Sequence, residues 1–178
     1  MNTVFSGKTY VTGNGTTAYS ISLQKRWNDC GTDAEALGQW LFEPIVPEFK
    51  DVPGAFKALG YEIVVSGADL GGGFKTNDHP VLTFKGAGVR LLISENFNRI
   101  FFRNAINLGM PVITCPGILE IAHTGDVLTG DMATGFVKNE TTGETLQGVP
   151  MSKLALELMS AGGLLPYYKA QLEREKGK

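Results

Sequence analysis

The sequence predicts a single α/β domain built on a mixed β-sheet that combines helix crossovers with antiparallel hairpins. Two observations predict this fold. In the middle of the chain, short apolar runs alternate with helix-compatible segments, and this β-α-β-α-β succession is typical of parallel strands joined by helices. Toward the end, short runs separated by Thr-Gly turns indicate antiparallel hairpins.

The first fifty residues predict one strand, one turn and one short helix. Residues 7–11 have the pattern of a strand, and the Gly13-Asn14-Gly15 run is typical of a turn. Residues 16–22 are polar and ambiguous. Thr32-Asp33 can cap a helix over 34–42, which a Glu-Pro pair closes.

The central part of the chain carries the alternation of strands and helices. We expect, in order, a strand at 62–66, a helix at 81–85, a buried strand at 89–93, a helix at about 95–108 and a strand at 111–114. The longer helix has its apolar residues at helical spacing, and Gly109 with Pro111 ends it.

The last third of the chain changes character. Hairpin strands are expected around the runs 125–128, 135–137 and 144–146. A helix then begins near Pro150 and stops at Gly162-Gly163. Residues 1–178 are expected to form one domain, with 170–178 as a solvated tail.

Composition narrows the class of protein. With 43% hydrophobic and 19% charged residues, the 178-residue chain is expected to be folded and globular. A formal net charge of −2 and the lack of a basic patch give no reason to expect nucleic acid or a membrane as a partner. No stretch has the length of a membrane span, and the first residues do not resemble a signal peptide.

Two cysteines, Cys30 and Cys115, lie far apart in dissimilar contexts. A disulfide between them is conceivable, but two separate thiols in the reducing cytoplasm fit better. Two cysteines cannot by themselves ligate zinc or an iron–sulfur cluster. Cys115, which follows a buried strand, is expected to pack as a small apolar group.

The glycine run at 71–73 and the polar residues after it are the most informative part of the chain. Three glycines let the backbone turn through positive φ and approach a bound group closely. Asp78 or His79 can cap the following helix, and Pro80 suits its first turn. Free backbone N–H groups and the helix dipole would then favour an anion, and Lys75 adds a cation. The run predicts a carboxylate or phosphate site.

Other interpretations of this run remain open or are excluded. A plain glycine-rich turn with a solvated lysine is about as common as an anion site. The run is not a Walker A loop, because no Gly-Lys-Ser/Thr follows, and it lacks the G-x-G-x-x-G spacing of a dinucleotide fold.

Several longer patterns resemble one known family over most of the chain, from Gly7 to Leu165. The matching stretches are His79-Pro80-Val81 through Lys85, Gly88-Val89, Phe97 to Val112 with its Arg99-Ile100-Phe101-Phe102-Arg103-Asn104 core, Thr141-Thr142-Gly143, and Ala161 to Leu164. In these the chain resembles the small subunits of 3-isopropylmalate dehydratase and homoaconitase-type enzymes.

This resemblance implies a fold, an activity and a partner. The fold would be the swivelling β/β/α domain of the aconitase C-terminal type. The activity would be that of a hydro-lyase that dehydrates and rehydrates a hydroxy di- or tricarboxylic acid. The resemblance also implies that a large subunit carries the [4Fe-4S] cluster, so that this chain binds no cofactor itself.

The resemblance also implies roles for the glycine loop. The family has a Gly-Ser-Ser-Arg-Glu-His stretch that supplies a serine base and a carboxylate-binding arginine. Aligned on its histidine, Thr76 would stand in for the serine as catalytic base and Asn77 would stand at the arginine. Lys75 would supply the lost charge, with Gly72 and Gly73 helping to orient the carboxylate. An acidic motif usual near the family's N-terminus is also missing, since residues 16–21 read Thr-Thr-Ala-Tyr-Ser-Ile.

Two functional hypotheses follow from these departures. The first is a hydro-lyase small subunit with atypical substrate specificity. The alternative is a catalytically silent swivel-type domain that binds a carboxylate or a partner protein without turnover. Outside the loop, His79 is expected to be structural, His123 to be a surface residue, and Arg99 and Arg103 to be solvated or to face a partner.

Overall fold

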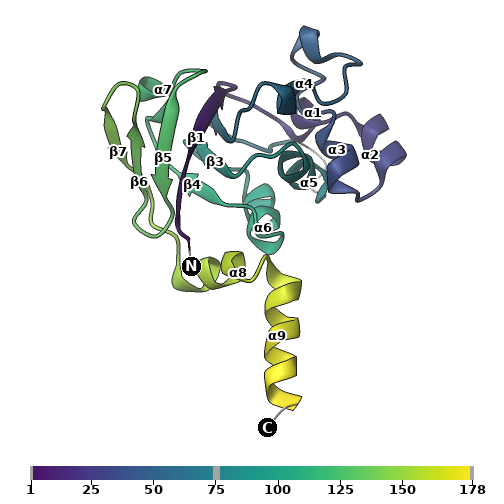
Figure 1. Cartoon of the computed structure of the whole chain (residues 1–178), viewed down its shortest axis with the longest axis vertical. Helices are drawn as coiled ribbons and strands as arrows, with labels where there is room; N and C mark the ends of the chain where they lie inside the picture. Colours follow the sequence, from purple (N-terminus) through teal and green to yellow (C-terminus); the bar gives the residue numbers. More distant parts are fainter. Residues whose placement is uncertain (1, 74–76, 177–178) are drawn as a thin grey trace.

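A computed structural model describes residues 2–73 and 77–176. Within these residues one sheet of seven strands forms the centre of the protein, in the order β4-β3-β2-β1-β5-β6-β7 (Figure 1). The strands are β1 (Val4–Val11), β2 (Ile63–Ser66), β3 (Leu91–Ser94), β4 (Val112–Thr114), β5 (Val127–Asp131), β6 (Phe136–Asn139) and β7 (Thr145–Gln147).

Strand β1 joins two halves of different character. On one side it runs parallel to β2, with Thr9 opposite Ile63, and β3 and β4 continue the parallel half. On the other side it runs antiparallel to β5, with Val4 opposite Asp131, and β6 and β7 continue as antiparallel strands. This arrangement confirms the predicted mixed sheet.

Helices cover the sheet and extend from it. They are α1 (Ala18–Ile21), α2 (Gln24–Cys30), α3 (Ala34–Gly38), α4 (Ala55–Ala58), α5 (His79–Gly86), α6 (Arg99–Asn107), α7 (Ile118–Ile121), α8 (Lys153–Ser160) and α9 (Leu164–Lys176), with a 3-10 turn η1 at Pro47–Phe49. Helices α1 to α5 gather on one side of the parallel strands, and β5 to β7 with α7 lie on the other (Figure 1).

Alternate residues of the parallel strands enter two separate cores. Val64 and Leu92 pack with Phe84 and Phe101 on the side of α5 and α6. Their neighbours along the strands, among them Ile93, pack against the antiparallel half. Because side chains of a strand point alternately to its two faces, strands buried on both faces are continuously apolar. The buried strands predicted in this region are confirmed.

Local contacts explain where helix boundaries differ from the prediction. Helix α6 begins at Arg99 rather than near residue 95, because Asn98 caps it by accepting from the Ile100 N–H at 3.1 Å. The predicted helix over 34–42 starts at Ala34 under an Asp33 cap but ends at Gly38, and Phe42 adopts a positive φ of 62°. Helices α1, α2, α4, α7 and α9 were not predicted.

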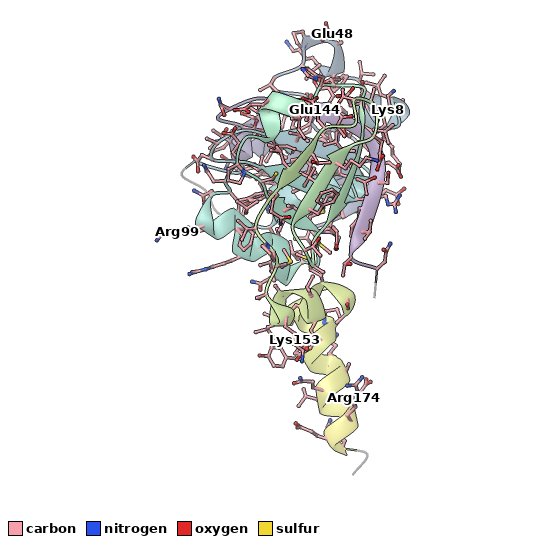
Figure 2. The ribbon with its side chains drawn as sticks, turned by 90° about the vertical axis from the view of Figure 1, so that its left-hand side faces the viewer. Lys8, Glu48, Arg99, Glu144, Lys153 and Arg174 are labelled. Atoms are coloured by element: carbon pink, nitrogen blue, oxygen red, sulfur yellow. The ribbon has the colours of Figure 1, made fainter. Side chains whose placement is uncertain are left out.

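The C-terminal helix α9 projects away from the body of the protein (Figures 1 and 2). It follows α8 after Gly162-Gly163, the predicted stop. Residues 170–176, expected as a tail, continue this helix, and none of its residues is buried. Among the residues that the structure describes, no helix is both long and apolar enough to cross a membrane.

A glycine loop as the candidate active site

The candidate site lies where the chain leaves the carboxyl end of β2. The backbone turns there through three positive φ angles, 60° at Asp69, 80° at Gly71 and 113° at Gly73. The Asp69 N–H donates to Asn96 Oδ1 at 2.8 Å, which fixes the start of the loop to the end of β3. Ligand sites of parallel sheets typically form at this edge, where the strands end.

Backbone hydrogen bonds join the loop to the N-terminal segment. The Gly71 N–H donates to the Thr16 carbonyl at 2.8 Å, and the Ala18 N–H donates to the Gly72 carbonyl at 2.9 Å. Thr17 caps α1 through a capping box with Ser20. The polar segment 16–22, ambiguous in sequence, is therefore a short helix that lies against the loop.

One of the glycines, Gly71, is required by a close contact, whereas the contact at Gly72 is with an exposed side chain that can turn away. A Cβ placed on Gly71 would lie 2.2 Å from the Phe101 ring, and one on Gly72 would lie 2.2 Å from Asp69 Oδ2. Gly73 differs, because a Cβ there would meet only ordinary contacts of 3.9 Å with Thr17 and Tyr19. Gly71 thus allows α6 to pack directly against the loop.

The Gly72 amide is not the free donor that the glycine run predicted. Its N–H donates to the Asp69 carbonyl at 3.1 Å and is engaged within the turn. The capping prediction is also corrected. Asp78 occupies the N-cap position of α5 but makes no side-chain capping bond, because its backbone is already helical at φ −78° and ψ −17°. His79 is the first helical residue, and Pro80 lies in the first turn as expected.

Asn77 is held from α6, and its side-chain oxygen is buried. The Asn104 Nδ2 donates to the Asn77 carbonyl at 3.2 Å. The Asn77 Oδ1 is buried and has no hydrogen-bond partner among the described residues. A buried amide oxygen without a donor is costly, so this atom is suited to accept from a bound group. The predicted residues Lys75 and Thr76 lie outside the described residues.

An aromatic stack borders the loop. Tyr19, Trp27 and His79 lie ring on ring, with centroids 5.6 and 5.4 Å apart and interplanar angles of 20°. Trp27 is buried and His79 is half-buried, and the structural role of His79 stays a prediction. Sequence reasoning missed Trp27, because its helix α2 has no capping side chain or apolar periodicity that marks it.

The remaining candidate residues lie apart from the loop. His123 is exposed and pairs with Asp126 at 3.5 Å, as expected for a surface residue. Arg99 and Arg103 are exposed on α6. Both cysteines are free thiols, and burial raises the pKa of Cys115 to about 11. Over residues 2–73 and 77–176, no group of three or more His, Cys, Asp or Glu side chains could hold a metal ion.

Comparison with known proteins identifies relatives over most of the chain, although no family model matches it. It is 46% identical over 138 residues to the 3-isopropylmalate dehydratase small subunit of Pyrobaculum calidifontis, covering 78% of this chain and 81% of the relative. It is 38% identical over 174 residues to the isopropylmalate/citramalate isomerase small subunit of Methanocaldococcus jannaschii, covering 97% and 98%.

A solved structure shares the fold. The crystal structure of 3-isopropylmalate dehydratase (leuD) from Methanocaldococcus jannaschii matches with a TM-score of 0.82 at 24% identity, over 98% of this chain and 99% of the other. This likeness confirms the predicted α/β fold with a mixed sheet.

Proposed function

Because the chain belongs to the 3-isopropylmalate dehydratase small-subunit family, we propose that its substrate is a hydroxy dicarboxylic acid, dehydrated and rehydrated together with a large subunit. The hydro-lyase assignment rests on one observation: identity with named small subunits extends over nearly the whole of both chains. The names of the relatives include isopropylmalate and citramalate, which are both hydroxy dicarboxylates.

The glycine loop supports this proposal through its place and chemistry. It lies at the carboxyl edge of the parallel strands, anchored from α1 and α6. Lys75 would bind one substrate carboxylate as a point charge, and Gly73 would let that group come close to the backbone. Asn77 is neutral, so its amide would hydrogen-bond the substrate without the bidentate grip of a guanidinium.

Thr76 would move the proton. In the dehydration direction its Oγ1, as the alkoxide, would take a proton from the carbon beside a carboxylate and become the hydroxyl, while hydroxide leaves the neighbouring carbon. In hydration the same hydroxyl would return the proton to that carbon. Because a lysine and an amide would hold the substrate in place of an arginine, we expect the substrate specificity to differ from that of relatives with the usual loop.

The iron–sulfur cluster is assigned to the large subunit. The described residues do not fit it, since Cys115 is buried with a raised pKa and no other cysteine lies with it. When bound in the partner, the cluster would supply a Lewis acid for the leaving hydroxyl. The free thiols of this chain support a cytoplasmic location.

Reconstitution tests this function. The chain is co-purified anaerobically with the large subunit encoded in the same genome, and hydroxy dicarboxylates are screened for alkene absorbance in the ultraviolet. We expect turnover only with both chains, and a loss of at least tenfold with Thr76→Ala or Lys75→Ala. Thr32→Ala and Lys57→Ala, on exposed residues away from the loop, serve as controls. A cluster-bearing complex without turnover would contradict the proposal and support a silent domain.

A further inference from the structure

Helix α6 presents two faces with different neighbours. Toward the glycine loop, Phe101 packs on Gly71 and Asn104 holds Asn77. Residues about half a turn away, Arg99 and Arg103, point to the opposite side because side chains of a helix repeat every 3.6 residues. Figure 2 shows Arg99 projecting from α6 away from the body of the protein.

An apolar groove runs beside that opposite face. A pocket of about 290 Å³ is lined by Phe97 and Phe102, the two arginines, Asn96 and Thr114. A second pocket of about 190 Å³ shares Phe102 and Thr114 and continues to Val149 and Met151. The groove therefore follows the outer side of β4, the edge strand of the sheet.

The two arginines lack a counter-charge. Neither forms an ion pair with any residue of 2–73 or 77–176. They stand one turn apart on α6, where like charges repel, and Arg99, the first residue of the helix, also lies where the helix dipole disfavours a cation. Two cations without a counter-charge at the rim of an apolar groove fit a partner surface on which acidic residues surround an apolar side chain.

We propose that a segment of the large subunit binds in this groove, and that this segment carries an apolar side chain flanked by acidic residues. This proposal rests on the proposed function. The groove spans two joined apolar pockets, which suits a protein segment better than a small dicarboxylate. Its arginines are exposed at the rim, as is typical of charged residues that surround a protein interface. Val149, 57% exposed, forms its other end.

Docking here reaches the glycine loop through α6. The helix contacts the partner on one face and holds Gly71 and Asn77 on the other. A partner seated in the groove would fix the position of α6, and thereby the orientation of the loop.

Charge reversal of the arginines tests the groove. The double variant Arg99→Glu/Arg103→Glu is expected to weaken binding of the large subunit at least tenfold in a direct binding assay. Arg99→Glu places a carboxylate in the first turn of α6, where the helix dipole favours it, and Arg103→Glu changes an exposed residue, so the melting temperature should not fall. Val149→Glu, at the other end of the groove, should also weaken binding. The double variant Lys50→Glu/Lys57→Glu changes the net charge equally on exposed residues elsewhere and should bind normally.

Other outcomes separate the hypotheses. Unchanged affinity in both groove variants would overturn the docking proposal while leaving the proposed function intact. Normal assembly with lost turnover in the arginine variant would also overturn it, because the arginines would then act on substrate. Failure of the unmodified chain to bind the large subunit would instead contradict the proposed function itself.

Discussion

The Phe101 ring occupies the space that a side chain at position 71 would need, only 2.2 Å from a Cβ built on Gly71. Helix α6 and the glycine loop are therefore in backbone-to-ring contact, and the loop cannot move without displacing a core aromatic residue. Phe101 is itself buried in the cluster beneath α5. The close packing of α6 on the start of the loop thus depends on the absence of a side chain at position 71.

Gly71→Ala is expected to destabilise the protein by about 2–5 kcal/mol. The alanine would combine a left-handed backbone, worth about 1–2 kcal/mol, with an overpacked contact on Phe101, worth about 1–3 kcal/mol. Denaturant unfolding measures the change. Gly60→Ala, with φ of 70° and open space around its Cβ, should lose only the backbone part. Equal losses in both variants would show that the Phe101 contact is not restrictive.

Asn104→Ala is expected to lower kcat severalfold while leaving KM nearly unchanged. The variant removes the 3.2 Å hydrogen bond to the Asn77 carbonyl, a contribution of about 1 kcal/mol, and loosens the loop from α6. Steady-state kinetics of the reconstituted complex check this. Asn107→Ala, an exposed asparagine on the same helix, is the matched control. If both variants kept full activity, Asn104 would have no positioning role.

Glu43 is expected to make stability fall in acid. Hydrogen bonds from the Arg26 guanidinium, one at 2.9 Å, hold the pKa of the buried Glu43 below its usual value of 4.5. A depressed folded pKa stabilises the protein above the unfolded value, and this contribution disappears as pH falls through the folded pKa. Denaturation from pH 7 to 3 should therefore show wild type and Glu43→Gln converging below about pH 4.5. A constant gap across that range would contradict the assignment.

The two thiols are expected to react with iodoacetamide in a fixed order. Burial raises the pKa of Cys115 to about 11, so on the order of one molecule in a thousand carries its thiolate at pH 8. Cys30 is only half buried and should be alkylated first. Mass spectrometry of the native protein should find Cys115 unmodified, and unfolding in urea should expose it. Rapid native labelling of Cys115 would show that its core opens.

Polar substitutions on α9 are expected to leave the subunit's stability unchanged within about 0.5 kcal/mol. Leu165 and Leu172 are 73% and 55% exposed, so Leu165→Ser/Leu172→Ser removes little buried surface. Urea unfolding checks this against Leu158→Ser on α8, where the side chain is 8% exposed and a loss of about 2–5 kcal/mol is expected. A large loss in the α9 variant would mean that this helix packs in the isolated chain.

The fold was largely predictable because its elements carry local signals. Apolar runs mark β2 and β3, and Thr-Gly turns mark the hairpins of β5 to β7. The start of α6 was predicted too early, because Phe97 bridges to Leu70, a contact between distant parts of the chain, and the Asn98 cap begins the helix only after it.

The site was predictable in place but not in detail. The run of three glycines predicted the position of the loop. It could not show that the Gly72 N–H is engaged, because that depends on the turn in which it donates to the Asp69 carbonyl. The stack of Trp27 on His79 depends on α2 reaching α5, which no pattern of either helix signals.

The position of β1 has a consequence for synthesis of the chain. Its parallel neighbour begins at residue 63, whereas its antiparallel neighbour begins at residue 127. Translation proceeds at about 5–20 residues per second. The edge of β1 that pairs with β5 therefore stays unpaired for several seconds longer than the edge that pairs with β2. That edge is open to mispairing in the meantime. Chaperone demand should therefore concentrate on nascent chains that end between these two strands.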